Sequence, residues 1–335
     1  MQKALSLSYF GAQSRFANEI DAIVFDGQEY SRYIDLTSGG MGTPYYLCTT
    51  KKIPVTVNDI SYYSYCCGKA VFTEKETPKV ALFDTLNAVE PVEGLLFSKR
   101  FEKNINLRYG NWSDEIRKFV DGVVTAFSND YFILAAIGKT LLNEGSFRGL
   151  TFCGTSPNKI KLGDYPLFTF QKKVVGHYEN FRTLADTIEV TNCEACNMDA
   201  SDLVFTYDKF KDAVVYFDPA WPFAASYADK TNPYAIVAHD IPEILKQQLL
   251  DPIEALWTLD KPQKIYDDVT HWITMALQKG AKRVVANTQS TNFPDPKDLE
   301  TYLRTTFNVV KVVSSDQFSG MAKSKTFTEF WYVIE

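Results

Sequence analysis

Short runs of apolar, β-branched and aromatic residues recur along the chain, and three of them end in a polar or glycine-rich cluster. Residues 33–34 lead into DLTSGG, residues 53–57 into Asn58-Asp59, and residues 213–217 into Asp218-Pro219. Buried strands of a parallel sheet have this pattern, because both faces are covered and the carboxyl ends carry the polar groups that meet a ligand. We therefore expect three parallel strands whose carboxyl ends carry the chemistry of the protein.

The rest of the pattern predicts an α/β fold. Further apolar runs lie at residues 283–286, 308–313 and 327–334. The last two predict a closing hairpin, so the sheet should be mostly parallel with an antiparallel edge. Ser113 and the acids after it begin a helical pattern, and residues 241–250 and 266–278 predict crossover helices, the second of which ends before Gly280.

Between about residues 64 and 187 the alternation of strands and helices gives way to helices and then to a basic loop region rich in Gly, Pro and Asn. A chain of 335 residues accommodates one large α/β domain and a second module of roughly 100 residues. We therefore expect residues 1–65 and 186–335 to form the main domain. Residues 66–185 should form an inserted, mainly helical module.

Composition is that of an ordinary globular protein, with 45% hydrophobic and 23% charged residues. The apolar runs are too short to span a bilayer, and the N-terminus does not have the pattern of a signal peptide, so we expect a cytoplasmic protein without membrane contact. The net charge of −6 argues mildly against a nucleic-acid partner. Basic residues nevertheless gather in residues 146–173, which fits either a nucleic-acid-binding face or an ordinary solvated loop.

Cys193 and Cys196 form a C-x-x-C pair, which raises the question of a metal site. A zinc site would need a second pair with matching spacing, and the sequence offers only the adjacent Cys66 and Cys67 and three scattered histidines. We therefore expect free thiols and no metal.

Two clusters carry candidate chemistry. Glycines after Asp35 allow a ligand to approach the backbone, and Asp59 lies where a carboxylate accepts hydrogen bonds from ribose hydroxyls. In the segment 218–221, DPAW, a carboxylate and a backbone carbonyl are suited to accept the two hydrogens of an exocyclic base amine, while an aromatic ring grips the base. From the residues alone, a structural glycine turn and an Asp-Pro turn before a core tryptophan remain alternatives.

The order and spacing of these segments resemble the Dam-type (D12-class) DNA adenine-N6 methyltransferases over most of the chain. The cofactor segments of that family resemble residues 8–13 (SYFGAQ), 35–40 (DLTSGG), 57–60 (VNDI) and 188–195 (IEVTNCEA). The recognition segment F-R-x-N and its loop resemble residues 147–148 and 154–158, and the V-Y-x-D-P-P-Y/W motif resembles residues 215–221. The family's closing segments resemble Tyr227, Tyr234, Ala286-Asn287, residues 310–315, Gly320, Lys323 and Glu329.

The resemblance implies a Rossmann-like sheet that binds S-adenosyl-L-methionine and an inserted target-recognition domain that binds double-stranded DNA. The implied reaction transfers a methyl group to N6 of an adenine flipped out of the duplex. Catalytic roles fall on Asp218, Pro219 and Trp221. Cofactor contacts fall on Tyr9, Phe10, Gly11, Asp35, Thr37, Gly39, Asp59, Ile60, Glu194, Ala195 and Asp218. DNA contacts fall on Arg148, Asn158, Lys159, Lys161 and Tyr227.

Four positions depart from the family pattern: Gln13 replaces a lysine, Thr37 a phenylalanine, Met41 a glycine and Ala220 the second proline. These departures leave two alternatives to the preferred function. One is a weakened or inactive methyltransferase-like protein that binds nucleic acid, and the other is methylation of cytosine N4 or of RNA. The resemblance further implies a gene of bacterial or phage origin. It does not define the recognition sequence, an associated restriction endonuclease or the oligomeric state.

Overall fold

The computed structural model describes residues 17–74, 82–99, 112–144, 146–147, 150–151, 166–219, 221, 262–290, 294–318 and 326–335. The predicted helix at residues 241–250 lies outside these segments.

The structure is an α/β fold built on a mixed sheet of seven strands in the spatial order β5-β2-β1-β6-β7-β9-β8, which is compatible with a Rossmann-like sheet. The strands are β1 Tyr33–Asp35, β2 Val55–Asn58, β5 Glu194–Cys196, β6 Val214–Phe217, β7 Arg283–Gln289, β8 Val309–Phe318 and β9 Thr326–Ile334. The pairs from β5 to β7 are parallel, whereas β9 is antiparallel to both β7 and β8. The mostly parallel sheet with a closing hairpin is therefore confirmed.

One strand is shorter than the family resemblance implied. The segment at residues 188–195 resembles a strand of the family whose end contacts the cofactor, but β5 covers only Glu194–Cys196. Asn192 has a φ of 63°, a left-handed conformation that interrupts extended backbone just before the strand. The carboxyl end of β5 consequently lies at Cys196.

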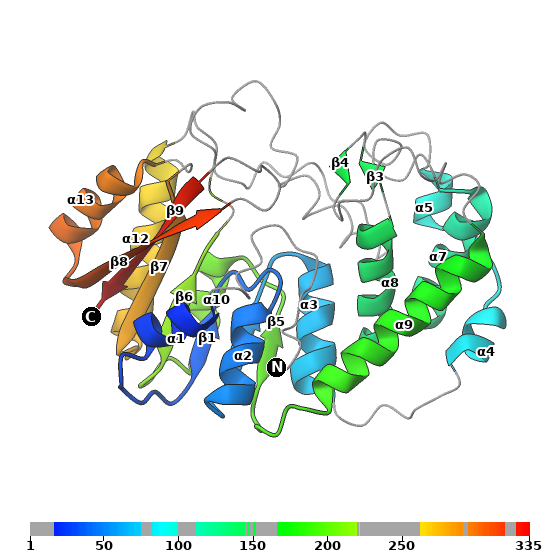
Figure 1. The fold of residues 1–335 in the computed structure, drawn as a ribbon, viewed down its shortest axis with the longest axis horizontal. Helices are drawn as coiled ribbons and strands as arrows, with labels where there is room; N and C mark the ends of the chain where they lie inside the picture. The colour runs from blue at the N-terminus through cyan, green and yellow to red at the C-terminus, as the bar shows by residue number, and fades with distance from the viewer. Residues whose placement is uncertain are drawn as a thin grey trace.

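Both faces of the sheet are covered, as Figure 1 shows. Alternate strand residues enter two separate cores, with Tyr33, Val57 and Tyr216 in one and Ile34 and Phe217 in the other. The helices of the main sheet region are α1 Ala17–Val24, α2 Gly42–Thr50, α10 Ala200–Thr206, α12 Pro262–Gln278 and α13 Pro296–Thr306. This two-sided burial explains why the parallel strands have continuous apolar sequences.

Between β2 and β5 the described chain is mainly helical, as expected. Its elements are α3 Tyr62–Gly68, the π-helical turn η2 Lys69–Thr73, α4 Leu82–Asn87, α5 Leu95–Ser98, α7 Asp114–Ala126, α8 Tyr131–Glu144, the short strands β3 Ser146–Phe147 and β4 Leu150–Thr151, and α9 Leu167–Ala185. Ser113 caps α7 by accepting a hydrogen bond from the Ile116 amide, as its sequence predicted. Phe132 of α8 and Val174 of α9 belong to the same core as Val57 of the sheet, so the helical segment packs directly against the β5 side.

Within the described segments, no helix has both the length and the apolar character that crossing a bilayer requires.

Candidate functional site

The candidate site lies at the carboxyl edge of the sheet, between β1 and β6. Strands β2 and β5 follow β1 on one side of it in the sheet, whereas β6 lies on the other side of β1. Ligands of open α/β sheets bind in the crevice outside the strand ends where the order reverses in this way. Asp35 is the last residue of β1 and Asp218 directly follows β6, so the fold brings these two predicted residues to the switch point.

The glycine-rich loop after β1 is organised by two carboxylates. The Thr37 amide donates to Asp35 Oδ1 over 3.2 Å, and the Gly39 amide donates to Asp59 Oδ2 over 2.8 Å. Asp59 Oδ1 accepts a second bond of 2.8 Å from the Ser61 amide. Each carboxylate oxygen can accept a further bond, so Asp59 holds the loop and retains capacity for ligand hydroxyls.

The turn after β6 is held from two sides. The Asp218 amide donates to Thr37 Oγ1 over 2.9 Å, and the Trp221 amide donates to the Pro219 carbonyl over 2.8 Å. The indole Nε1 of Trp221 donates to the Asn287 carbonyl over 2.8 Å, and the side chain is only 3% exposed. In this structure the ring expected to grip a base is a core residue that anchors the turn.

Burial perturbs the acids at this edge. Burial raises the pKa of Asp35 to about 8, the amide of Thr37 opposes that rise, and the charge of Asp59 adds to it. Burial likewise raises the pKa of Asp59 to about 6, against the opposing hydrogen bonds from Ser61 and Gly39. The edge is therefore a group of carboxyls that would ionise more readily beside a positive ligand.

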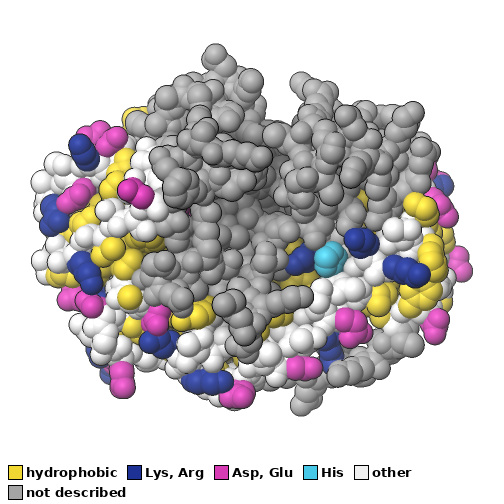
Figure 2. Space-filling view, in the orientation of Figure 1, with side chains coloured by type: hydrophobic (Ala, Val, Ile, Leu, Met, Phe, Trp, Pro, Cys, Tyr) yellow, Lys and Arg dark blue, Asp and Glu magenta, His cyan; other side chains and the backbone are white. Residues whose placement is uncertain are grey.

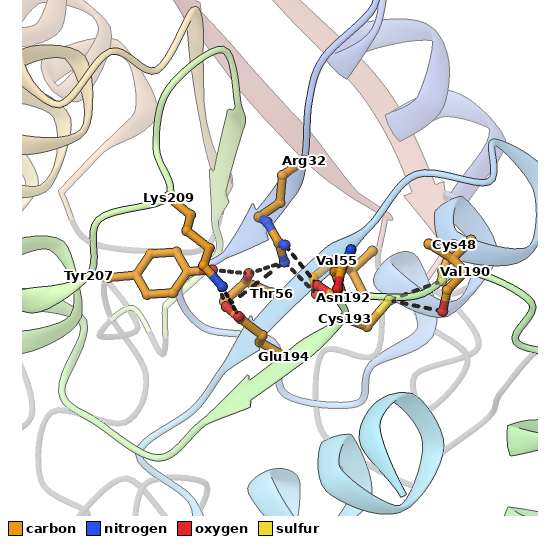
Figure 3. A network of polar contacts seen from close by, with 10 residues as sticks. All are labelled: Arg32, Cys48, Val55, Thr56, Val190, Asn192, Cys193, Glu194, Tyr207 and Lys209. Atoms are coloured by element: carbon orange, nitrogen blue, oxygen red, sulfur yellow. Dashed lines mark hydrogen bonds and ion pairs between the residues drawn. The ribbon is translucent and has the colours of Figure 1, made fainter. Parts of the chain in front are cut away.

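Glu194, which the sequence assigned to the cofactor, belongs to a different group of contacts (Figure 3). Its carboxylate bonds to Tyr207 and Lys209 and lies 4.0 Å from the guanidinium of Arg32. Burial works against the charge, but the bonds from Lys209 and Tyr207 hold the pKa of Glu194 below its usual value. Glu194 pairs with Thr56 in the sheet, two residues before β5 ends. Its carboxylate is therefore held by neighbouring side chains of the sheet and does not lie at the strand end.

Asn197 and Met198 take the place at the edge that the sequence gave to Glu194 and Ala195. The Asn197 amide group donates to the carbonyls of Asp59 and Ile60 over 2.8 and 2.9 Å. Ile60 and Met198 are 40% and 42% exposed. The sequence did not single out these residues because the family resemblance placed the end of this strand at Glu194 and Ala195, whereas β5 ends at Cys196.

Ala195 instead packs beneath the edge, against α3. A Cβ atom built on Gly68 would lie 3.2 Å from the Ala195 Cβ and 2.8 Å from Val57 Cγ2. The helix after β2 therefore approaches the sheet so closely that only glycine fits at residue 68 without movement of its neighbours.

The C-x-x-C pair does not form a metal site within the described residues, where no group of three or more potential ligands occurs. Cys193 Sγ instead lies 3.7 Å from Cys48 Sγ on α2.

The expected DNA contacts lie outside the described residues, as do several cofactor residues. These are Arg148, Asn158, Lys159, Lys161 and Tyr227, together with Tyr9, Phe10 and Gly11. Among described residues, burial and then the charges of Lys139 on α8 and Lys173 on α9 lower the pKa of His177, also on α9, to about 4. Figure 2 shows basic side chains and a histidine on this part of the surface.

Comparison with known proteins does not identify a family, since no protein-family model and no curated protein matches the chain.

Proposed function

We propose that this protein transfers the methyl group of S-adenosylmethionine to N6 of an adenine in double-stranded DNA. The observation that carries the proposal is the meeting of Asp35, Thr37, Asp59 and Asp218-Pro219 at the switch point of the sheet. These residues belong to the segments that resemble the cofactor loop and the catalytic motif of Dam-type methyltransferases.

The charge of the edge favours this cofactor over a dinucleotide. S-adenosylmethionine carries a sulfonium, an ammonium and a carboxylate group. Its two positive groups would be stabilised beside the ionised carboxylates of this edge and would favour ionisation of Asp35, whose pKa burial raises to about 8. The pyrophosphate of a dinucleotide carries only negative charge and would gain no such stabilisation. Asp59 has acceptor capacity left for ribose hydroxyls, and the exposed side chains of Ile60 and Met198 offer apolar contacts to the adenine of the cofactor.

The residues after β6 offer two hydrogen-bond acceptors for the exocyclic amine of a base. The amine is a poor nucleophile because its lone pair is delocalised into the base. The Asp218 carboxylate and the remaining lone pair of the Pro219 carbonyl would accept its two hydrogens and favour a tetrahedral nitrogen. The nitrogen then forms a bond to the methyl carbon, the carbon–sulfur bond breaks with its electron pair on sulfur, and one amine proton is released. Cytosine N4 presents the same kind of amine, so base analysis has to separate the two.

Basic side chains of the helical segment between β2 and β5 support DNA as the proposed partner. Lys139 and Lys173 place positive charge on α8 and α9 of a protein whose net charge is −6. Phosphate contacts need such local groups rather than a basic protein overall.

One observation favours a second candidate, a methyltransferase-like protein that binds nucleic acid without turnover. The buried Trp221 ring is committed to the Asn287 carbonyl and offers no open face to a base in this structure. The preferred function therefore needs either another ring to hold the base or a rearrangement of this turn when DNA binds.

Calorimetric titration of the full chain with S-adenosylmethionine tests the proposal and separates the two candidates. We expect a saturable binding isotherm for the native protein and an affinity roughly 10- to 100-fold lower for Asp59→Asn, because the new amide group would oppose one of the two backbone donors. Asp208→Asn, at an exposed position, is the matched control and should bind as the native protein does. Absence of detectable binding by the native protein would reject the enzyme function in favour of the second candidate.

A further inference from the structure

We propose that Thr37 is a positioning residue whose hydroxyl joins the cofactor loop to the catalytic turn and sets the direction of Asp218. The inference rests on the proposed function and adds a residue role at that same site. The family resemblance expects a phenylalanine at this position, so the role belongs to this chain's own residue.

The hydrogen bonds between β1 and β6 depart from the regular parallel pattern just beyond the strand ends. In a parallel pair, a residue donates to one partner residue and accepts from the residue two positions later. The Leu36 amide donates to the Tyr216 carbonyl over 2.9 Å, so the regular continuation would be a bond from the Asp218 amide to the Leu36 carbonyl. That bond is replaced. The Asp218 amide donates to Thr37 Oγ1 over 2.9 Å, and the Leu36 carbonyl accepts from the Asn58 side chain over 2.9 Å.

Beyond the last backbone bond between β1 and β6, the Thr37 hydroxyl takes the place of the missing backbone acceptor. An amide has one hydrogen, so this bond fixes the peptide group that precedes the Asp218 side chain. Its loss would leave the part-buried Asp218 amide without this acceptor and loosen the backbone that carries the carboxylate.

Thr37 also links this bond to the glycine-rich loop after β1. The Thr37 amide donates to Asp35 Oδ1, so one residue connects the acid at the end of β1 with the acid after β6. Because Thr37 Oγ1 acts as an acceptor toward Asp218, its hydroxyl proton remains available as a donor to another group. A loop shaped by a bound cofactor would thereby hold Asp218 in position for the target amine.

Substitution of Thr37 by valine and by serine tests this role. Valine keeps the shape of threonine and removes the hydroxyl, whereas serine retains the acceptor. For Thr37→Val we expect kcat for methyl transfer to fall roughly 10- to 100-fold, the effect of a small misplacement of a reacting group, while the Kd for S-adenosylmethionine stays within about threefold of the native value. Thr37→Ser should restore kcat to within about threefold of the native value.

Hydrogen exchange of the Asp218 amide, followed by NMR on the full 15N-labelled chain, gives a readout that does not require activity. Thr37→Val should speed this exchange about tenfold or more, and Thr37→Ser should not. Thermal unfolding of both variants within a few degrees of the native chain would show that they are folded.

Native exchange and native kcat in the valine variant would overturn the inference, and so would a loss of cofactor affinity as large as the loss in kcat. If the native protein neither binds S-adenosylmethionine nor transfers methyl groups, the proposed function fails. The exchange rates would then still report whether the Thr37 hydroxyl holds the Asp218 amide, so the two failures are distinguishable.

Discussion

The buried carboxyl of Asp35 should make the stability of the protein depend on pH in a direction opposite to that of a salt-bridged aspartate. Burial raises its pKa to about 8 in the folded protein, whereas an aspartate in the unfolded chain titrates near 3.9. Between these values the folded protein keeps a proton that the unfolded chain releases. The free energy of unfolding therefore falls as pH rises through this range, with the full contribution present below about pH 4 and none left above about pH 8.

The magnitude follows from the same pKa difference. Each pH unit within the range changes the free energy of unfolding by about 1.4 kcal/mol. From pH 5 to pH 7, Asp35 alone should lower the stability of the native protein by about 3 kcal/mol. Asparagine imitates the neutral acid, because its carbonyl oxygen can still accept from the Thr37 amide and its amide group can face the Tyr33 hydroxyl. Asp35→Asn should remove this part of the pH dependence.

Urea unfolding of the native protein and of Asp35→Asn at pH 5, 6 and 7 measures the effect. The difference in unfolding free energy between the two proteins cancels the contribution of titrating groups that do not interact with Asp35. We expect the native protein to lose about 3 kcal/mol relative to the variant between pH 5 and pH 7. A difference that stays constant to within about 0.5 kcal/mol would show that burial does not keep Asp35 protonated in the folded protein.

Two further predictions concern packing and the Glu194 network. Gly68→Ala should destabilise the protein by about 1–3 kcal/mol in urea unfolding, because the new Cβ would lie 2.8 Å from Val57 Cγ2. Gly176→Ala places its new carbon where nothing lies within 4 Å, so it should stabilise α9 by about 0.5–1 kcal/mol. Equal effects of the two alanines would contradict the close approach of α3. Glu194→Gln should lower the melting temperature yet leave the Kd for S-adenosylmethionine within about threefold of the native value, because the carboxylate serves Tyr207 and Lys209. A tenfold loss of affinity at unchanged stability would restore Glu194 to the cofactor site.

The sheet could be predicted from the sequence because its signals are local and consistent. Strands buried on both faces have continuous apolar sequences, and each is followed by a polar cluster, so β1, β2, β6 and β7 were all located. The extent of β5 was wrong for an equally physical reason. The family resemblance implied a strand over residues 188–195, but the left-handed backbone of Asn192 interrupts that segment, and a resemblance of motifs does not report such a conformation.

The three acids of the candidate site could be predicted from the sequence, whereas the burial of Trp221 and the hydrogen bond of Thr37 could not. Asp35, Asp59 and Asp218 stand out because each follows an apolar run, and the fold brings the ends of those runs to one edge. The burial of Trp221 depends on which side of the turn faces the second core, and a tetrapeptide does not encode that choice. The role of Thr37 depends on a backbone bond that the separating strands no longer make, which appears only in three dimensions.

Modified-base analysis of duplex DNA incubated with the purified full chain and S-adenosylmethionine is the sharpest test of the proposed methyl transfer. Hydrolysis to nucleosides and mass spectrometry would identify the product, with Asp218→Ala as the inactive counterpart and Asp208→Asn as the surface control. We expect N6-methyladenine with the native protein and with Asp208→Asn, and a loss of at least about 100-fold with Asp218→Ala. Unmodified adenine after incubation with a native protein that binds the cofactor, or an undiminished yield from Asp218→Ala, would contradict the proposed methyl transfer.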